Sequence, residues 1–476
     1  MTNGHRRRAD AKGMKHVDPF ERGEQLAKTV GAWIVASVET RVFWPKKPQA
    51  IEYNGREFLL LPARRSEPPG GVPVDQSPAI ALRADAHRIT SQDARVEISR
   101  FASVLAWQEG AKLDIVGWSG GNLPRQMGFL RNRGVSDFLD GEFLQVPQTE
   151  TARAALAFYR EGISLENPFY AFLSMYKAFS VAIPDGSRRG QWLRDHKDAL
   201  KDRAATRLQE IEGEGHDIGD YVYTQGRNAI AHADREPFVN PDNTDDSFRL
   251  QRDFPVMEQF ASMAIEEACG VKQLNTIWRE HLFELEGFRA LIPANALAVM
   301  RAGEGIPIDV RVTWPTAWLL RARGRPQNHD LPPMRLISAV WVESCLFLTF
   351  RSQSDLVEVK VTLDFEEERL IFDPLRALRV SRNRKVRTAI EEEIAVARFS
   401  FCIFCNGYLE IWDSGRDVRL GRSDVFIPVN MMVNPEGFKQ QIAELESLLQ
   451  SIDLAESVSE PTLVENSAVA RSQPPR

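Results

Sequence analysis

The stretch NPFYAFLSMYKAFSVAI, residues 167–183, decides the fold of the central part of the chain. Asn167 followed by Pro168 is typical of a helix N-cap with a proline in the first turn. Behind this start, large apolar side chains recur every three or four residues; they are Phe169, Phe172, Leu173, Tyr176, Phe179 and Ile183. That spacing predicts an amphipathic helix that buries one face.

The sequence on both sides of this helix has the same texture, which predicts a helical bundle over residues 149–270. The segment 188–211 continues the helical pattern, and a further helix is expected from Asp217 to Ala233, ended by Pro237. Gly270 is a suitable C-terminal stop. It follows a last apolar stripe, formed by Met257, Phe260, Ala261, Ala264 and Ala268. We therefore expect a bundle of four to five helices.

Residues 21–148 predict a mixed α/β domain. The dipeptide Asn54-Gly55, flanked by apolar runs, is a strong hairpin signal. Residues 26–38 fit either a helix or a buried strand, and residues 96–110 have helical spacing. Residues 111–118 have the composition of a strand and are followed by a glycine-rich loop.

Beyond a helical connector at residues 271–305, residues 306–452 are rich in β-branched and aromatic runs. These runs are IDVRVTW, ISAVWVESCLFLTF, LVEVKVTLDF, VARFSFCIF, YLEIWD and VFIPVNMMV. They predict a β-sandwich or a barrel-like domain, with a final helix that begins at Asn434-Pro435. The basic segment 1–20 and the segment 453–476 predict disordered tails. The expected fold class is multidomain α+β.

Amino-acid composition excludes some classes of function but identifies none. The 476 residues carry a net charge of -6, which excludes a protein whose whole surface binds nucleic acid but allows a local basic patch. Four cysteines are too few for a disulfide framework, which points to a reducing compartment. The sequence has no signal-peptide pattern and no run of about 18 apolar residues, so we expect a cytoplasmic protein without membrane association.

The stretch YVYTQGRNAIAHADREPFVNP, residues 221–241, contains the pattern of most chemical interest: Arg227-Asn228 and, four residues after the asparagine, His232. At about 100° per residue, Asn228 and His232 lie ~40° apart on one helix face, which Tyr221 shares. Arg227 lies ~100° from Asn228 on the same helix. One helix therefore does not easily bring all three groups to one point, whereas two copies across a two-fold axis would.

This Arg-polar-x-x-x-His pattern resembles the signature of the HEPN superfamily, the higher eukaryotes and prokaryotes nucleotide-binding domains. The resemblance covers residues 149–270 and implies a helical bundle with an active cleft at a homodimer interface. Many members are metal-independent endoribonucleases in toxin–antitoxin, antiphage and RNA-processing systems. The resemblance implies RNA as substrate, self-association through the bundle, and an unidentified antitoxin or sensor partner. Other members are non-catalytic, so a dimerisation, nucleotide-binding or regulatory role is the alternative.

Elementary chemistry agrees with such a reaction. RNA carries its own nucleophile, the 2′-hydroxyl, so cleavage requires no metal and no cofactor. His232 suits proton transfer near neutral pH, Arg227 offers a fork for phosphate oxygens, and Asn228 can orient either one. The structural alternatives are that Arg227 pairs with Asp220 or Asp234, and that His232 interacts with the dipole at a helix C-terminus.

A closer resemblance is to the proteins known as methylamine utilisation protein MauJ. It rests on RFASVLAWQEG and VGWSGGNLPRQ within residues 100–126, and on GRNAIAHADREPFVNP at residues 226–241. It implies that the N-terminal domain and the bundle occur together. The name reflects an operon and implies no defined chemistry or substrate.

Two further patterns predict structure more readily than chemistry. Gly117-Trp118-Ser119-Gly120-Gly121 matches G-x-S-x-G, but a loop-like Asn-Leu-Pro follows, which favours a glycine turn between strands over a hydrolase nucleophile. Cys402 and Cys405 lack a second ligand pair, so we predict buried thiols in a strand and no metal site.

A basic run between residues 376 and 387 is followed at once by three glutamates. The run comprises Arg376, Arg379, Arg382, Arg384, Lys385 and Arg387. It is either a solvated face balanced by nearby acids or a phosphate-binding patch that contacts RNA. Together with Tyr221, these residues are the candidate RNA contacts outside the motif.

Overall fold

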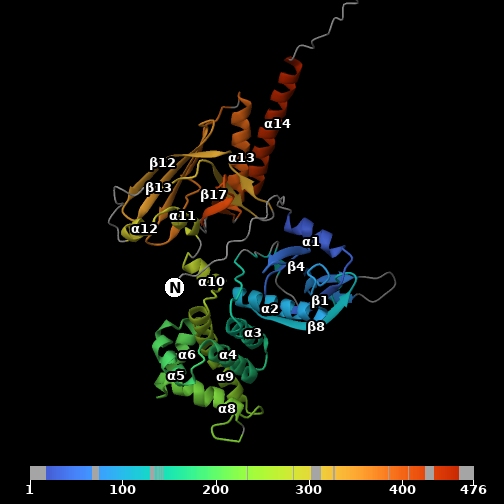
Figure 1. Ribbon diagram of the computed structural model, residues 1–476, viewed down its shortest axis with the longest axis vertical. Coiled ribbons are helices and arrows are strands. Elements are labelled where there is room, and N and C mark those ends of the chain that lie inside the picture. Colours follow the sequence, from blue (N-terminus) through green and yellow to red (C-terminus); the bar gives the residue numbers. More distant parts are fainter. Residues whose placement is uncertain are drawn as a thin grey trace, which may run out of the picture. The chain divides into compact units, whose positions relative to one another are not determined.

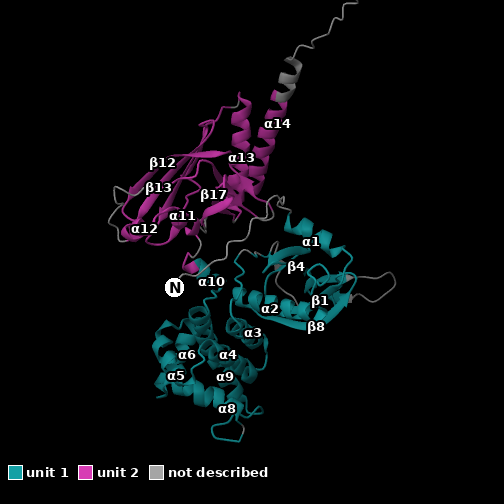
Figure 2. Cartoon of the chain, in the orientation of Figure 1, with its two compact units in different colours: residues 1–278 teal, residues 279–476 magenta. Residues whose placement is uncertain are grey.

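The computed structural model divides into two compact units, residues 1–278 and 279–476, coloured separately in Figure 2. The residues it describes are 18–66, 74–128, 135–136, 139, 141, 143–232, 234–281, 284–301, 312–324, 327–383, 385–405, 407–423 and 434–459, of which 135–136 and 453–459 are described by their backbone alone. Each unit has its own hydrophobic core. No described helix is long and apolar enough to cross a membrane.

The first unit begins with a five-stranded antiparallel sheet in the order β3-β4-β7-β1-β8. Its strands are β1 (Trp33–Thr40), β3 (Gln49–Tyr53), β4 (Arg56–Leu61), β7 (Ala79–Arg83) and β8 (Leu113–Gly121). β3 and β4 form the predicted hairpin, in which Asn54 and Gly55 have φ values of 50° and 70°. A two-residue turn of this type requires two positive φ angles, which Asn-Gly adopts readily.

Helices cover both faces of this sheet (Figure 1). Ile34 and Ala36 of β1 pack in the same core as α2 (Ser91–Glu109), whereas Trp33 and Val35 pack with Leu26 of α1 (Pro19–Ala27). Side chains alternate along a strand, so β1 is buried on both sides. Residues 26–38, which fitted helix or strand, contain the end of α1 and most of β1. The helix predicted at 96–110 is confirmed and ends at Gly110, with φ of 56°.

Two short strand pairs complete the sheet part of the first unit. β2 (Trp44–Pro45) pairs in parallel with β9 (Val135–Ser136), and β5 (Arg64–Ser66) pairs with β6 (Val74–Gln76). The proline- and glycine-rich residues 67–73 lie outside the described residues.

The rest of the first unit is helical, as predicted. Its elements are α3 (Glu150–Ser164), α4 (Pro168–Ala182), α5 (Gly186–His196), α6 (Asp202–Gly213), α7 (Ile218–Tyr221), α8 (Ala229–Ala231) and α9 (Thr244–Ala264), with π-helical segments at Val222–Asn228 and Ile265–Cys269. The Asn167 side chain caps α4 by accepting hydrogen bonds from two backbone N–H groups. The helical pattern predicted over 188–211 is confirmed, but it is divided between α5 and α6. A 3₁₀ turn at Lys197–Ala199 is followed by Leu200, whose extended backbone lets its side chain enter the core.

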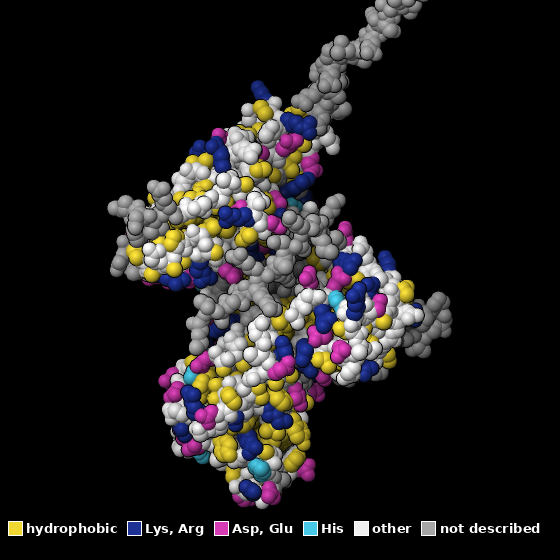
Figure 3. Space-filling view, viewed as in Figure 1, with side chains coloured by type: hydrophobic (Ala, Val, Ile, Leu, Met, Phe, Trp, Pro, Cys, Tyr) yellow, Lys and Arg dark blue, Asp and Glu magenta, His cyan; other side chains and the backbone are white. Residues whose placement is uncertain are grey.

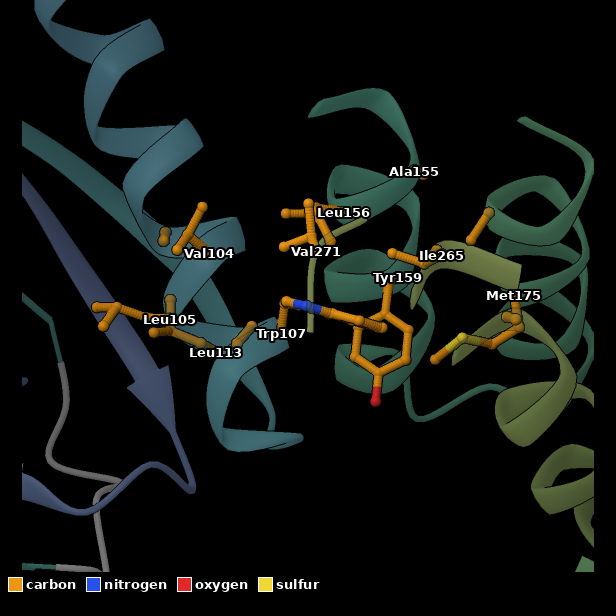
Figure 4. Packing of buried hydrophobic residues seen from close by; sticks show 14 of the residues in the cluster. Val104, Leu105, Trp107, Leu113, Ala155, Leu156, Tyr159, Met175, Ile265 and Val271 are labelled. Carbon is orange, nitrogen blue, oxygen red and sulfur yellow. The ribbon is translucent and has the colours of Figure 1, made fainter. Parts of the chain in front are cut away.

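The sheet part and the helical part of the first unit share one core, which Figure 4 shows where α2 meets α3. The ring of Trp107 on α2 meets Tyr159 of α3 edge to face, with centroids 4.9 Å apart at 85°. Val104 and Leu156 pack in the same cluster. Aromatic rings of this size each bury about 150–250 Å². α2 and α3 are therefore fixed against each other.

The second unit is built on one curled antiparallel sheet. The strand path is β15-β14-β13-β12-β10-β17-β18, with β11 beside β10 and β16 beside β14. The strands are β10 (Trp318–Arg323), β11 (His329–Asp330), β12 (Met334–Val342), β13 (Cys345–Ser352), β14 (Val357–Asp364), β15 (Arg369–Ile371), β16 (Leu378–Val380), β17 (Tyr408–Asp413) and β18 (Val418–Ser423).

The two end strands of this sheet approach each other, which gives it the barrel-like form that was one of the two predictions. A Cβ atom on Gly421 of β18 would lie 2.6 Å from Cδ1 of Leu370 in β15. Glu284 bridges the two strands: its carboxylate accepts a hydrogen bond from the N–H of Leu370 at 2.8 Å, and its carbonyl accepts one from the N–H of Arg422 at 3.0 Å.

Helices account for the rest of the second unit and correct one strand prediction. The run VARFSFCIF lies in α13 (Arg387–Phe404), where Phe399 and Ile403 recur at helical spacing and join the core of the sheet. The opposite side of α13 packs on α14 (Pro435–Ser459). The connector is α10 (Leu274–Arg279), α11 (Glu286–Leu291) and α12 (Ala294–Arg301). The run VFIPVNMMV lies outside the described residues, as do 1–17 and 460–476 of the predicted tails.

Candidate functional site

The motif stretch lies on three successive helical pieces, α7, the π-helical segment Val222–Asn228 and α8. Asp217 begins this series by capping α7, as predicted. In a π-helix each N–H bonds the carbonyl five residues earlier, so a turn is wider than in an α-helix and the angular spacing of side chains changes. The helix ends at Ala231, and His232 is extended, with φ of -127° and ψ of 95°. Inserted π turns of this kind are frequent at functional sites.

Arg227, Asn228 and His232 meet within a single chain. Nη1 of Arg227 donates to Oδ1 of Asn228 at 2.6 Å and lies 3.2 Å from Nε2 of His232. All three side chains are half-exposed. They meet without a second copy because the chain is not one regular helix here: Arg227 and Asn228 lie in a π-helical segment, and His232 follows the last helical residue in an extended conformation.

The contact between Arg227 and His232 places a guanidinium against the imidazole. A guanidinium has only donors, so Nε2 of His232 is assigned as the acceptor in this contact. The backbone N–H of His232 donates to the carbonyl of Asn228 at 3.0 Å, which also places the ring at the C-terminus of α8.

Arg227 has no carboxylate partner among the residues that the structure describes. The two acids considered as partners are engaged elsewhere: Asp220 pairs with Arg194 at 3.2 Å, and Asp234 pairs with Arg235 at 3.8 Å. Neither of these acids therefore forms an ion pair with Arg227 that would stabilise the bundle. The guanidinium of Arg227 contacts the side-chain amide of Asn228 and the ring of His232, which leaves its charge available to an anion.

Tyr221 is not part of this group, contrary to its predicted place on the same face. Its side chain is 5 % exposed, and its hydroxyl donates to Oδ2 of Asp253 at 2.9 Å and accepts from Nη2 of Arg207 at 3.0 Å. The wider π turn between Tyr221 and Asn228 breaks the seven-residue alignment assumed for an α-helix. Tyr221 therefore faces the interior and does not present its ring to RNA in this structure.

The sequence reasoning missed the buried ion pair that holds Tyr221. Arg207 of α6 and Asp253 of α9 are 4 % and 2 % exposed, with Nε and Oδ1 2.8 Å apart. Burial opposes the charge on Arg207, but hydrogen bonds to Asp253 and Glu210 outweigh it and raise the pKa of the guanidinium. Arg249 adds a second cation, donating to Asp253 and to the carbonyl of Gln225 in the π-helical segment. These contacts fix the motif-bearing segment from behind.

Gly226 fixes the segment from a second side. A Cβ atom at this position would lie 2.6 Å from two ring atoms of Phe172 in α4. The glycine thus allows the π-helical backbone to pack directly on an aromatic ring of the core.

Exposed aromatic side chains occur on the motif-bearing segment and on α4 and α9, two helices that contact it. Tyr223 lies on the π-helical segment and is 49 % exposed, while Phe238 precedes Val239, whose N–H donates to the carbonyl of Ala229 in α8. Phe248 on α9 and Tyr170 on α4 are more than half exposed. Figure 3 shows hydrophobic side chains gathered on this helical part of the molecule. Such a surface is suited to bases or to another protein surface.

The basic run of the second unit is largely paired with acids. Arg382 lies 3.6 Å from the buried Glu393, Arg387 lies 2.9 Å from Glu391, and Arg376 lies 3.9 Å from Asp373. Arg379 and Lys385 are exposed, and Arg384 lies outside the described residues. These pairs agree with a solvated, balanced face, and a role in RNA binding stays a prediction.

The two remaining sequence patterns lie in a strand and at the end of a helix. Gly117–Gly121 form the end of β8 and not a turn, and the Ser119 hydroxyl donates to the carbonyl of Arg125 at 2.8 Å. Cys402 is buried and Cys405 exposed, because both lie at the end of a helix and not in a strand. No group of three or more potential metal ligands occurs among the described residues.

Comparison with known proteins gives one result that bears on this site. A family model described as methylamine utilization protein MauJ matches residues 155–266. Over these residues the chain is similar to MauJ. The span begins in α3, contains the whole motif and ends just beyond α9, so it includes the Arg207–Asp253 pair as well. No curated protein and no solved structure gives a significant match.

Proposed function

We propose that this protein is a metal-independent endoribonuclease of the HEPN type, with Arg227, Asn228 and His232 as its catalytic group. One observation carries the proposal: a partly exposed arginine, without a carboxylate partner among the described residues, lies 3.2 Å from Nε2 of a histidine. A phosphate-binding cation beside a general base is the pair of groups that cleavage through the 2′-hydroxyl needs.

The reaction assigns one task to each side chain. Nε2 of His232 takes the proton of the 2′-hydroxyl, and the 2′-oxygen attacks the adjacent phosphorus. The guanidinium of Arg227 moves its hydrogen bonds to the phosphate oxygens and balances their growing charge. The bond from phosphorus to the 5′-oxygen breaks, and the leaving oxygen takes a proton from water or from an imidazolium. The products are a 2′,3′-cyclic phosphate and a free 5′-hydroxyl.

The surroundings of the site support a nucleic-acid substrate. Tyr223 lies on the motif-bearing segment, Phe238 lies six residues beyond His232, and Phe248 lies on α9. All three rings are exposed, and stacking of a base on such a ring contributes about 1–3 kcal/mol. In the proposed complex these rings hold the bases while Arg227 holds one phosphate. A homodimer through the same face would bring two motifs together, as in HEPN ribonucleases. A stress, toxin or defence role is the biological setting of this proposal.

The test is an RNase assay in excess EDTA with the purified chain and two substitutions. Arg227→Ala should lower the cleavage rate about 10²–10³-fold, because one charged donor to the transition state is lost. His232→Ala should lower it about 10²–10⁴-fold, because the general base is lost. Arg235→Ala and His216→Ala are matched controls on exposed residues and should leave the rate unchanged. Equal activity of all four variants would refute the assignment.

A second candidate is a non-catalytic regulatory or dimerisation protein. Two observations favour it: the exposed aromatic surface around the motif and the similarity to MauJ, whose description names methylamine utilisation and no reaction. This candidate predicts no RNA cleavage and a stable dimer that Phe248→Ser weakens. Sedimentation velocity on wild type and Phe248→Ser, read together with the RNase assay, separates the two functions.

A further inference from the structure

A cavity of about 420 Å³ lies in the first unit, between α2, α3, β8 and the β3–β4 turn. Its volume falls within the range of about 300–1,000 Å³ that is usual for small-ligand sites. α8, which ends at the motif, lies at the far end of the helical part from α2 in Figure 1. The cavity is therefore separate from the proposed catalytic group.

The cavity wall is strongly positive. Arg95, Arg100, Arg153 and Arg160 line it, and among the described residues the single lining carboxylate is Glu97. Glu97 is already satisfied, because it pairs with Arg56 at 3.2 Å and with Arg100 at 3.1 Å.

Two of the four arginines share one carboxylate that is itself exposed. Arg100 lies 3.7 Å from Glu150, and Arg153 pairs with the same side chain, which is 75 % exposed. Exposed pairs of this kind contribute about 0–1 kcal/mol, so an incoming anion can replace Glu150 with little loss.

Arg160, unlike Arg100 and Arg153, forms no ion pair within the part of the chain that the structure describes. The hydrogen bond that it makes there is a long one, 3.4 Å from Nη1 to the carbonyl of Ser99. Asp114 and Glu161 act on it electrostatically, but none of the described carboxylates lies within ion-pair distance. Burial lowers the pKa of this guanidinium, which shows that its charge is held at a cost. A bound anion would remove that cost.

The rest of the wall contains polar side chains, among them Asn54 and Gln92, and an apolar part that includes one flat ring. Trp118 of β8 lines the cavity, and Cζ of Arg95 lies 5.8 Å from the centroid of its ring. Val104 and Leu156 form the floor and belong to the packed layer shown in Figure 4. Because that layer fixes α2 and α3 against each other, the cavity is preformed and does not depend on a ligand.

We propose that this cavity binds a small phosphorylated ligand with a flat ring, of the size and chemistry of a nucleoside monophosphate or diphosphate. The phosphate binds the guanidinium groups of Arg100, Arg153 and Arg160, whose planar forks match phosphate oxygens. The base stacks against Trp118 and displaces Arg95 from it or is enclosed between the two. A small anion without a ring would use only the arginines and bind more weakly.

The experiment is isothermal titration calorimetry on the full chain with AMP, ADP, GMP, inorganic phosphate and benzoate. At least one nucleotide should bind with a dissociation constant below about 100 μM, and at least about tenfold more tightly than phosphate or benzoate. Arg160→Gln, Arg153→Gln and Trp118→Leu should each weaken nucleotide binding about tenfold or more. Arg160→Lys, which keeps the charge and loses the fork, should also weaken it and guards against misfolding of the glutamine variant. Arg188→Gln, on the surface of α5, is the matched control.

Two results of the titrations would overturn the proposal directly, and the His232→Ala variant supplies a further test. One is the absence of nucleotide binding at millimolar concentration. The other is nucleotide binding that the three cavity substitutions leave unchanged, or that phosphate or benzoate equals. His232→Ala should bind the nucleotide as wild type does, so failure of the ribonuclease proposal would not remove this site. Loss of nucleotide binding in His232→Ala would place the nucleotide at the motif and contradict the cavity assignment.

Discussion

Nη1 of Arg227 lies 3.2 Å from Nε2 of His232, five residues further along the chain. The contact depends on two departures from regular α-helix: the π-helical segment that carries Arg227 and the extended backbone of His232. Asn228 completes the group by accepting a hydrogen bond from the same Nη1 atom. The arrangement exists in one chain before any partner or substrate binds.

The buried Arg207–Asp253 pair should be the main support of this arrangement. Asp253→Ala leaves a buried guanidinium without its partner, which we expect to lower the free energy of unfolding by about 3–5 kcal/mol. Urea denaturation followed by circular dichroism measures this. Asp242→Ala, on an exposed loop residue, should change the free energy by less than about 0.5 kcal/mol. Similar values for the two variants would contradict the role given to the buried pair.

The contact between Gly226 and Phe172 predicts a steric effect. Gly226→Ala places a methyl group against the ring and should destabilise the chain by about 1–3 kcal/mol. In a Phe172→Leu background the same substitution should be less destabilising, because the ring atoms are gone. Gly213→Ala is a suitable control, since a Cβ atom there meets nothing within 4 Å. Thermal denaturation of the four variants decides the point, and additive effects in the double variant would argue against a direct clash.

Glu258 predicts a pH dependence of stability. Burial raises its pKa above the ordinary value of 4.5, and the hydroxyl of Tyr159 approaches its carboxylate at 3.5 Å. A raised pKa means that the protonated form favours the folded state, so this contribution is present at pH 4 and is lost as the pH rises through the folded-state pKa. Glu258→Gln should therefore match wild type near pH 4 and be more stable at pH 7. Denaturation midpoints at both pH values test this, and an equal difference at the two would contradict it.

Cys402 and Cys405 predict different reactivity. Burial raises the pKa of the Cys402 thiol to about 12, and Cys405 is exposed. Iodoacetamide at pH 8 should label Cys405 about tenfold faster or more, because the thiolate is the reactive form. Peptide mass spectrometry of the native protein gives the two rates. Equal labelling rates of the two thiols in the native protein would contradict the burial of Cys402 and the exposure of Cys405.

The elements with strong local signals could be predicted from the sequence. The Asn54-Gly55 hairpin, the Asn167 cap of α4 and the stop at Gly270 each rest on a turn or cap whose backbone angles only a few residues adopt. These signals lie within a few neighbouring residues, so no knowledge of the remaining fold is needed.

Other features depended on contacts between distant parts of the chain. The run VARFSFCIF has strand composition, yet it forms a helix because its apolar residues pack between the sheet and α14. The π-helical segment has no local signature, and it turned Tyr221 toward Arg207 and Asp253. The arginines that line the cavity come from both α2 and α3. The residue spacing within either helix does not show that the two helices lie side by side.

The most direct test of the proposed catalytic group uses an RNA oligonucleotide cut by the purified chain in EDTA, with the product ends identified by mass spectrometry. Cleavage through the 2′-hydroxyl predicts 2′,3′-cyclic phosphate and 5′-hydroxyl ends, no cleavage where a 2′-deoxy nucleotide replaces the cut site, and loss of these products with His232→Ala. Cleavage at the 2′-deoxy site, or the same products at the same rate from His232→Ala, would contradict it.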